Sequence, residues 1–382
     1  MASDSIPKLF QPFKLGNITL SHRVVMAPLT RYKATRLSHI PINPMLKTHY
    51  EQRSRIPGTL IIAEATYIAA KAGGDPSIPG IWSQEQIAAW REVTDAVHAN
   101  GSYIFLQLWA LGRVAEVEYL HEEDPAFDFV APSPIPLKAN KGTPPRELTR
   151  AEIQEYIELW AQAARNAVLE AGFDGVEIHG AFGYLLDQFT KEVSNGRTDE
   201  YGGNIENRSR HALEVVKVVV DAIGAERTGI RVSPWSISND MRIENPVPQF
   251  THLVKALKEQ FPTLGYLHIV EPTSSRPDCS PNANDFIREI WKPNVLISAA
   301  MYTRDTAIRR AEERDNEVIA FGKAFIANPD LPMRLKLDLP LNVPDSKTYY
   351  TRGDQPDAEA GYNDYPFYTE LVDKQHSSIA SI

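Results

Sequence analysis

The sequence predicts a (β/α)8 barrel, formed by a single domain over residues 1–382. Short apolar runs recur eight times along the chain, and amphipathic stretches of helical length lie between many of them. No GxGxxG motif follows the first run. Strands that alternate with helices in this number are typical of a closed barrel, and the missing glycine motif argues against an open dinucleotide-binding sheet.

The eight apolar runs are the predicted strands, and they are Arg23–Ala27, Thr59–Ala63, Tyr103–Leu108, Gly175–His179, Thr228–Val232, Tyr266–Val270, Val295–Ala299 and Glu317–Ala320. Each is apolar on both faces, as expected for parallel strands that helices cover. The clearest predicted helices are Gln84–Asn100, Arg150–Ala171, Asn204–Ile223 and Val247–Phe261. Thr149 begins the pattern Thr-Arg-Ala-Glu, a capping box that marks the start of the second of these helices.

Three further segments complete the predicted barrel. Residues 13–23, FKLGNITLSHR, read as a hairpin with Gly16-Asn17 at its turn, and we expect it to form a lid over the barrel floor. The proline-rich insertion Val117–Leu148, after the third strand, should cap the barrel mouth. Asp338–Ile382 should wrap the outside, and residues 1–6 and 372–382 are expected to be disordered tails.

Composition excludes several classes of partner. The net charge of −9 argues against nucleic acid and anionic membranes, and no run approaches the roughly 20 apolar residues of a membrane helix. Cys279 is the only cysteine, so neither an intrachain disulfide nor a cysteine-rich metal site is expected. The N-terminus has no apolar run typical of a signal peptide. We therefore expect a cytoplasmic protein, monomeric or homodimeric, without a metal.

The ends of the predicted strands are unusually polar. Active sites of (β/α)8 barrels lie where the strands end, so these residues are the first candidates for a site. They are Pro28-Leu29-Thr30-Arg31, Glu64-Ala65-Thr66, Gln107-Leu108-Trp109, His179 and Arg231-Val232-Ser233-Pro234-Trp235. A single polar residue at a strand end is more often a surface hydrogen-bonding group than part of a functional site. Five polar strand ends that converge on one barrel mouth favour a functional site. No metal-like spacing and no nucleophile elbow is present, so hydrolysis has little support.

The last two strands indicate a phosphate site. Loops after the seventh and eighth strands of barrels often bind phosphate through backbone N–H groups. Here they read Ser298-Ala299-Ala300-Met301-Tyr302-Thr303 and Phe321-Gly322-Lys323-Ala324. Small residues allow close approach of an anion, and Lys323 adds positive charge, although small residues in such loops also serve packing. Together with the polar mouth, the two loops predict a phosphorylated cofactor across the barrel.

Several long motifs resemble those of the Old Yellow Enzyme family of FMN-dependent ene-reductases. They are LFQPFKLGNITLSHRVVMAPLTR, FLQLWALGR, DGVEIHGAFGYLLDQFTKEVSNGRTDEYGGNIENRSR, GIRVSPW, AFGKAFIANPDLP and GYNDYPFY, and they run nearly from end to end. The resemblance implies FMN as cofactor and NADPH as co-substrate. It implies that the flavin is lined by Pro28, Leu29, Thr30, Ala65, Gln107 and Arg231.

The resemblance also implies a reaction, the NADPH-driven reduction of the C=C bond of an enone-like substrate. His179 would donate a hydrogen bond to the substrate carbonyl, and Tyr184 would protonate the α-carbon. Trp109, Phe182, Tyr350 and Thr30 would shape the substrate pocket. The alternative to these catalytic roles is a structural one, in which His179 is a hydrogen-bonded histidine of the core and Tyr184 is a packing residue.

Three positions depart from the family pattern. Phe182 stands where a second carbonyl donor, Asn or His, is usual, and Ala300-Met301 stand where a glycine pair is usual. Lys323 stands where an arginine is expected. An ammonium group is a point charge, whereas a guanidinium can donate two parallel hydrogen bonds to a phosphate. These departures predict weaker FMN retention and an unusual substrate. They leave open an isomerase or cyclase of secondary metabolism without net reduction, and a flavin-poor binding protein without enzymatic activity.

Overall fold

The chain folds as a closed barrel of eight parallel strands in the computed structural model, which describes residues 6–140, 143–272, 278–280 and 282–368. The barrel strands are β3 (Val24–Met26), β4 (Leu60–Tyr67), β5 (Tyr103–Trp109), β8 (Gly175–Gly180), β9 (Thr228–Val232), β10 (Tyr266–Val270), β11 (Leu296–Ala299) and β12 (Glu317–Phe321). Neighbours pair in chain order, and parallel pairing of β12 with β3 closes the ring. All eight predicted strands are confirmed. The tails predicted at residues 1–6 and 372–382 lie, apart from Ile6, outside the described residues.

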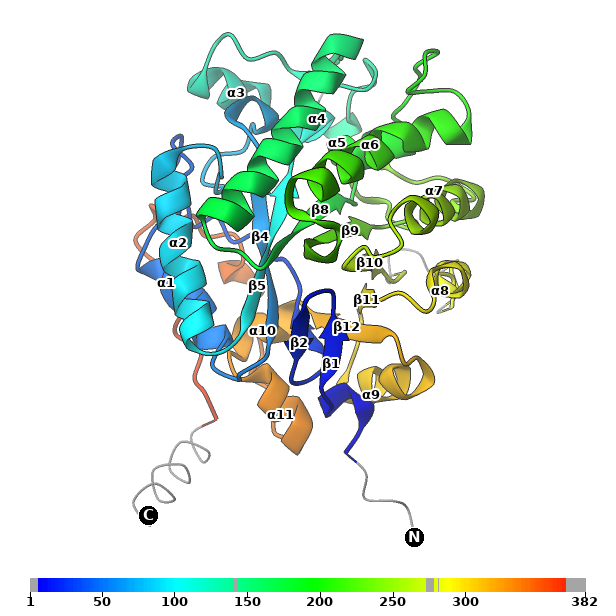
Figure 1. Ribbon diagram of the computed structural model, residues 1–382. Coiled ribbons are helices and arrows are strands. Elements are labelled where there is room, and N and C mark those ends of the chain that lie inside the picture. The colour runs from blue at the N-terminus through cyan, green and yellow to red at the C-terminus, as the bar shows by residue number, and fades with distance from the viewer. Residues whose placement is uncertain (1–5, 141–142, 273–277, 281, 369–382) are drawn as a thin grey trace, which may run out of the picture.

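Helices surround the barrel (Figure 1). They are α1 (Met45–Arg53), α2 (Gln84–Ala99), α4 (Arg150–Arg165), α5 (Leu185–Thr190), α6 (Ile205–Ile223), α7 (Val247–Gln260), α8 (Asp285–Trp291), α9 (Arg304–Glu313), α10 (Lys323–Ala327) and α11 (Leu331–Leu337). The predicted capping box is confirmed, because the Thr149 side chain accepts from the Glu152 N–H while the Glu152 side chain accepts from the Thr149 N–H. The four predicted helices are present, the second continuing beyond Arg165 as a π-helical turn.

The N-terminal hairpin closes the floor of the barrel, as predicted. Its strands β1 (Phe13–Leu15) and β2 (Ile18–Leu20) pair antiparallel, and their apolar side chains belong to one buried cluster with Phe105 and Tyr266 from the barrel interior. The turn needs glycine at position 16, because φ is +50° and a Cβ would lie 2.1 Å from the Glu226 carbonyl oxygen.

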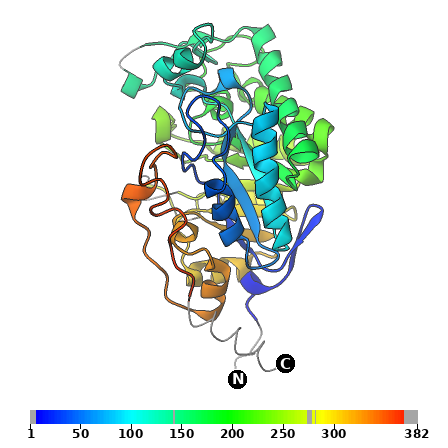
Figure 2. The ribbon, with the colours of Figure 1, turned by 90° about the vertical axis from the view of Figure 1, so that its left-hand side faces the viewer.

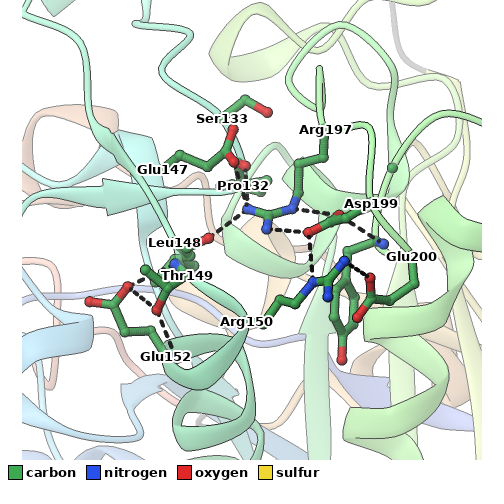
Figure 3. Close-up of polar contacts among 12 residues, drawn as sticks. Pro132, Ser133, Glu147, Leu148, Thr149, Arg150, Glu152, Arg197, Asp199 and Glu200 are labelled. Atoms are coloured by element: carbon green, nitrogen blue, oxygen red, sulfur yellow. Dashed lines mark hydrogen bonds and ion pairs between the residues drawn. The ribbon is translucent and has the colours of Figure 1, made fainter.

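The insertion after β5, which was predicted to cap the barrel mouth, is fastened by Arg197. It contains α3 (Val117–Glu123) and the short strands β6 (Val130–Ala131) and β7 (Arg146–Glu147). Arg197, in the loop after α5, donates to the carbonyl oxygens of Pro132 at 3.0 Å and Leu148 at 2.6 Å (Figure 3). Its guanidinium also pairs with Asp199, with Nη2 2.6 Å from Oδ2. One buried arginine thus joins the middle and the C-terminal end of the insertion to the loop after α5.

The C-terminal segment was predicted to wrap the outside over residues 338–382 and to bring Tyr350 to the substrate pocket, and part of it packs against the loop after β3. Arg31 donates from Nε to the Tyr349 carbonyl oxygen at 2.9 Å and from Nη2 to that of Gly361 at 2.8 Å. Lys33 donates to the Thr351 carbonyl oxygen. Figure 2 shows this segment, orange to red, on the opposite side of the barrel from the N-terminal hairpin. The segment therefore returns to the barrel mouth, anchored by cations that directly follow β3.

Candidate active site

A cavity of about 650 Å³ lies at the C-terminal ends of the barrel strands, within the usual size range of ligand pockets. Most of the predicted site residues line it: Pro28, Leu29, Thr30, Gln107, Trp109, His179, Phe182, Tyr184, Arg231, Lys323 and Tyr350. They come from loops and strands far apart in the sequence, and closure of the barrel brings them together. Four of the five polar strand ends therefore meet at one cavity, whereas none of Glu64-Ala65-Thr66 at the second strand lines it.

The other predicted cofactor residues do not line this cavity. Ala65 is buried with Tyr67 and Trp109 in one cluster behind the cavity wall, and Ala299 is buried at the end of β11. Ala300 and Met301 line a separate cavity of about 310 Å³. Gly322 packs close to Leu29, since a Cβ there would lie 3.2 Å from Leu29 Cδ2. These positions can act on a ligand through the backbone more readily than through side chains.

The backbone at Ala300 and Met301 has the conformation that glycine favours. Their φ angles are +90° and +64°, in the region where a Cβ clashes with the following carbonyl. The Met301 side chain is 70% exposed and points away from the protein interior. The loop therefore has a backbone conformation typical of glycine, although neither residue is glycine.

His179, near the end of β8, is a neutral hydrogen-bond donor. Burial and the charge of Arg231 lower the pKa of its imidazole to about 3. The backbone N–H of Ala181 donates to Nδ1 at 3.4 Å, so the single proton of the neutral ring belongs on Nε2. This N–H is suited to donate to an acceptor on a ligand.

Tyr184 stands beside His179 as an un-ionised acid. It precedes α5 as its N-cap residue, and its ring lies edge-on to Trp109 and His179, with centroid distances of 4.6 and 5.0 Å. Burial raises the pKa of Tyr184 to about 12, although a hydrogen bond with the Asn239 side chain acts in the opposite direction. The phenol therefore keeps its proton at neutral pH and can deliver it.

The loop that carries Phe182 is fixed by two hydrogen bonds to the segment after β9. The Phe182 N–H donates to Ser233 Oγ at 2.8 Å, and Asn239 Nδ2 donates to the Phe182 carbonyl oxygen at 2.9 Å. Phe182 itself has a φ of +56°. Asn239 lines the cavity but was not predicted from the sequence. The sequence feature that could have indicated Asn239 is its polar side chain in the loop that follows Arg231.

Asp75, Glu116 and Tyr32 also line the cavity and were not predicted. Tyr32 directly follows Arg31, after the first strand, whereas Asp75 and Glu116 lie in irregular segments further from the strand ends. Only the folded chain brings the two carboxylates to the mouth, so no local sequence pattern marks them.

Arg231 and its neighbours form a buried polar group with unused donors. Gln107 Nε2 donates to Glu177 Oε1, and His268 Nδ1 contacts Glu177 Oε2, both at 2.7 Å. Arg231 Nε is buried and has no hydrogen-bond partner within the described ranges. A buried charged donor without an acceptor is costly, so a bound acceptor is expected there. The polar edge of a flavin supplies such acceptors, and the cavity therefore fits the FMN that the resemblance implies.

The described residues hold neither a metal cluster nor a membrane-spanning helix. Among them, no group of three or more His, Cys, Asp or Glu side chains could hold a metal ion. No helix in the same part of the chain is long and apolar enough to cross a membrane.

The chain is similar to fungal oxidoreductases along almost its whole length. It is 47% identical to the NADP-dependent oxidoreductase lnbE of Aspergillus flavus, with 96% of this chain and 98% of the relative covered. It is 46% identical to the chanoclavine-I aldehyde reductase fgaOx3 of Penicillium roqueforti, with 95% and 97% covered. A probable inactive reductase, easA of Epichloe festucae var. lolii, is 44% identical, with 96% and 97% covered.

A solved structure agrees with these relatives. The old yellow enzyme from Trypanosoma cruzi superposes with a TM-score of 0.87 at 39% identity, covering 95% of this chain and 99% of that one. The family model described as NADH:flavin oxidoreductase / NADH oxidase matches residues 8–342. The protein is thus an FMN-dependent oxidoreductase with a nicotinamide co-substrate, and the chain belongs to the NADH:flavin oxidoreductase / NADH oxidase family.

Proposed function

We propose that this enzyme uses NADPH to reduce the C=C bond of an α,β-unsaturated carbonyl compound. The observation that carries the proposal is the pairing of a neutral His179 donor with a protonated Tyr184, whose rings lie 5.0 Å apart in one cavity. FMN bound in this cavity and reduced by NADPH would supply the hydride. Pro28, Leu29, Thr30, Gln107 and Arg231 would hold its ring system, with Lys323 toward its phosphate.

His179 would bind the substrate carbonyl oxygen through Nε2–H. Negative charge grows on that oxygen when the β-carbon accepts hydride, so a fixed donor is worth more in the transition state than in the ground state. Because the pKa of His179 is about 3, the imidazole stays neutral and donates over the whole range in which the protein is usually studied. The expected contribution of one such donor is roughly 3–4 kcal/mol.

Tyr184 would deliver a proton to the α-carbon. Its edge-on contacts with Trp109 and His179 restrict the phenol to one side of the cavity. A phenol with a pKa near 12 is fully protonated at neutral pH and gives up its proton only to a strongly basic carbon, such as an enolate. Proton transfer is therefore coupled to the arrival of hydride.

Phe182 favours a bulky apolar or aromatic substrate. It replaces a potential second donor, so the carbonyl is held by one side-chain hydrogen bond, and the phenyl ring offers a stacking surface instead. The relative in Penicillium roqueforti is named an aldehyde reductase. A conjugated aldehyde with an apolar body is accordingly the substrate class that we propose.

The test uses FMN-reconstituted protein, NADPH and a panel of conjugated aldehydes, ketones and nitroalkenes. Ene-reduction predicts consumption of one NADPH for each saturated product, with the carbonyl retained. Conversion of substrate without NADPH consumption would instead establish the isomerase or cyclase alternative. Failure to bind flavin at saturating FMN would remove the reductase assignment.

A further inference from the structure

A layer of polar side chains is buried inside the barrel beside the cavity. It consists of Gln107, Glu177, Arg231 and His268 from β5, β8, β9 and β10, and the strand register sets Gln107 opposite Glu177 and Arg231 opposite His268. Gln107 and Arg231 line the cavity, whereas Glu177 and His268 are fully buried. Barrel interiors are usually filled by branched apolar side chains, and a buried charge is costly. A buried carboxylate at this place is therefore expected to serve the site.

Glu177 determines the orientation of the Gln107 amide. Gln107 Nε2 donates to Glu177 Oε1 at 2.7 Å. An ionised carboxylate only accepts hydrogen bonds, so the amide nitrogen must face Glu177, and the amide oxygen is left for a ligand in the cavity. The ring system of oxidised FMN has a single N–H group, N3–H in its pyrimidine ring. The Gln107 oxygen can therefore accept from the pyrimidine end of the flavin.

Glu177 is ionised, and its charge offsets that of Arg231. Although burial acts to raise it, contact with His268 and the charge of Arg231 hold the pKa of the Glu177 carboxyl below its usual value. His268 Nδ1 lies 2.7 Å from Glu177 Oε2 and donates to it, since the carboxylate can only accept. Burial lowers the pKa of His268, so its imidazole is neutral. The layer thus combines one negative and one positive charge.

We infer that Glu177 is a positioning residue of the flavin site, which turns the Gln107 oxygen toward the pyrimidine end of FMN and limits how strongly Arg231 favours the reduced form. Two-electron reduction places a negative charge on that end of the flavin. A guanidinium there stabilises the reduced form, and a carboxylate behind it weakens this effect, which is one way in which a protein tunes a flavin. The inference concerns the cofactor and applies whichever substrate the enzyme reduces.

Glu177→Gln tests the effect of the charge. Glutamine keeps the size of the side chain and an oxygen that can accept from Gln107, and it removes the negative charge. The reduction potential of bound FMN is measured anaerobically against a reference dye, and the Kd of oxidised FMN by fluorescence titration. The affinity for reduced relative to oxidised FMN should rise about tenfold, which makes the potential about 30 mV more positive for a two-electron couple.

Glu317→Gln is the matched control. Glu317 is a buried carboxylate of β12 that pairs with Arg288 at 2.9 Å, and it does not line the cavity. Arg288 keeps Glu271 as a partner in this variant. The control should leave the reduction potential unchanged, and thermal melting shows that each variant is folded.

A flavin analogue tests the orientation of Gln107 in the unsubstituted enzyme. In 3-methyl-FMN a methyl group replaces the N3 hydrogen, so the analogue cannot donate to the Gln107 oxygen. It should bind about tenfold more weakly than FMN, as expected for the loss of one hydrogen bond. Gln107→Leu separates this effect from crowding by the methyl group, because leucine keeps bulk without an acceptor. That variant should bind FMN and 3-methyl-FMN alike.

Equal binding of FMN and 3-methyl-FMN to the unsubstituted enzyme would overturn the inference, and this result needs no variant that folds. An unchanged potential in Glu177→Gln, or an equal shift in Glu317→Gln, would also overturn it. Equal weakening of both redox forms in Glu177→Gln would show that the residue is merely structural. None of these measurements requires a substrate, so a failure here leaves the proposed reaction untouched.

Discussion

The phenyl ring of Phe182 lies over the guanidinium group of Arg231, with the ring centroid 5.2 Å from Cζ. A cation against an aromatic face is stabilised by roughly 0.5–2 kcal/mol, most when both are shielded from water. Phe182 therefore has two effects at once. The ring stabilises the buried guanidinium of Arg231, whose Nε has no hydrogen-bond partner among the described residues. It also offers no hydrogen bond to the substrate carbonyl, at a position where a polar side chain could donate one.

Phe182→Asn should raise the turnover of small cyclic enones by roughly tenfold, about 1.4 kcal/mol, because the amide can donate to the carbonyl oxygen. The backbone favours this exchange, since φ is +56° at this position and asparagine adopts that region more easily than phenylalanine. The measurement is the rate at which reduced enzyme reacts with cyclohexenone.

Phe182→Leu is the control for this prediction. It removes the aromatic ring and some volume but adds no donor, so it should not reproduce the gain. An equal gain in both variants would show that bulk and not hydrogen bonding limits the rate. No gain in a folded, FMN-loaded Phe182→Asn enzyme would disprove our interpretation of this residue.

Tyr184→Phe should separate the two halves of the catalytic cycle. The hydroxyl is lost while the edge-on packing against Trp109 and His179 is kept. Reduction by NADPH should stay nearly unchanged, and reaction with the conjugated aldehyde should slow by a factor of about 100 or more, as expected for loss of a general acid. Stopped-flow absorbance follows each half. An unchanged second half would assign the proton to solvent or to another residue.

Lys323→Arg should tighten FMN binding. Lys323 lines the cavity, and an arginine can hold a phosphate with two hydrogen bonds where lysine offers a point charge. Fluorescence titration of the apoprotein with FMN measures the Kd. Lys336→Arg, a like change on α11 away from the cavity lining, should leave the Kd unaltered. An FMN affinity that responds equally to both changes would contradict a phosphate contact at Lys323.

Arg197→Ala should lower the free energy of unfolding by about 3–5 kcal/mol, the usual loss when one partner of a buried ion pair is removed. The Arg197 side chain is 3% exposed and is paired with Asp199 (Figure 3). Arg150 contacts the same carboxylate at 3.6 Å but is 65% exposed, so Arg150→Ala should cost about 1 kcal/mol or less. Urea unfolding of both variants measures the difference. Similar losses would show that Arg197 does not fasten the insertion.

Glu64→Gln should remove a pH dependence of stability. Burial raises the pKa of Glu64 to about 7, although a hydrogen bond from the Arg31 backbone N–H and the charges of Arg31 and Lys33 act to lower it. The folded state therefore holds this proton more tightly than the unfolded state. Stability should fall as pH rises from about 4.5 through 7, by on the order of 3 kcal/mol for a shift of this size.

The glutamine variant should lack that fall, so its advantage over the unsubstituted protein should grow between pH 5 and pH 8. Urea unfolding at several pH values tests this expectation. A constant difference across the range would show that Glu64 does not titrate there.

The sequence by itself determined the barrel and the residues at the strand ends. Strand periodicity, the capping box at Thr149 and the glycine turn at Gly16 are local features, each set by residues that are neighbours in the chain. Because parallel strands of a closed barrel end at one rim, the strand pattern alone also places Gln107, His179 and Arg231 in one site.

Only the tertiary structure decided which residues lie opposite those strand ends. Asp75, Glu116 and Asn239 come from loops that no strand pattern marks, and Tyr349 comes from a C-terminal segment that Arg31 holds at the mouth. Tyr350, beside it, was expected only from the family resemblance. The lowered pKa of His179 and the raised pKa of Tyr184 depend on burial and on Arg231 and Asn239, which are distant in the chain. Loop positions and pKa values arise from contacts between distant segments, and no local pattern encodes such contacts.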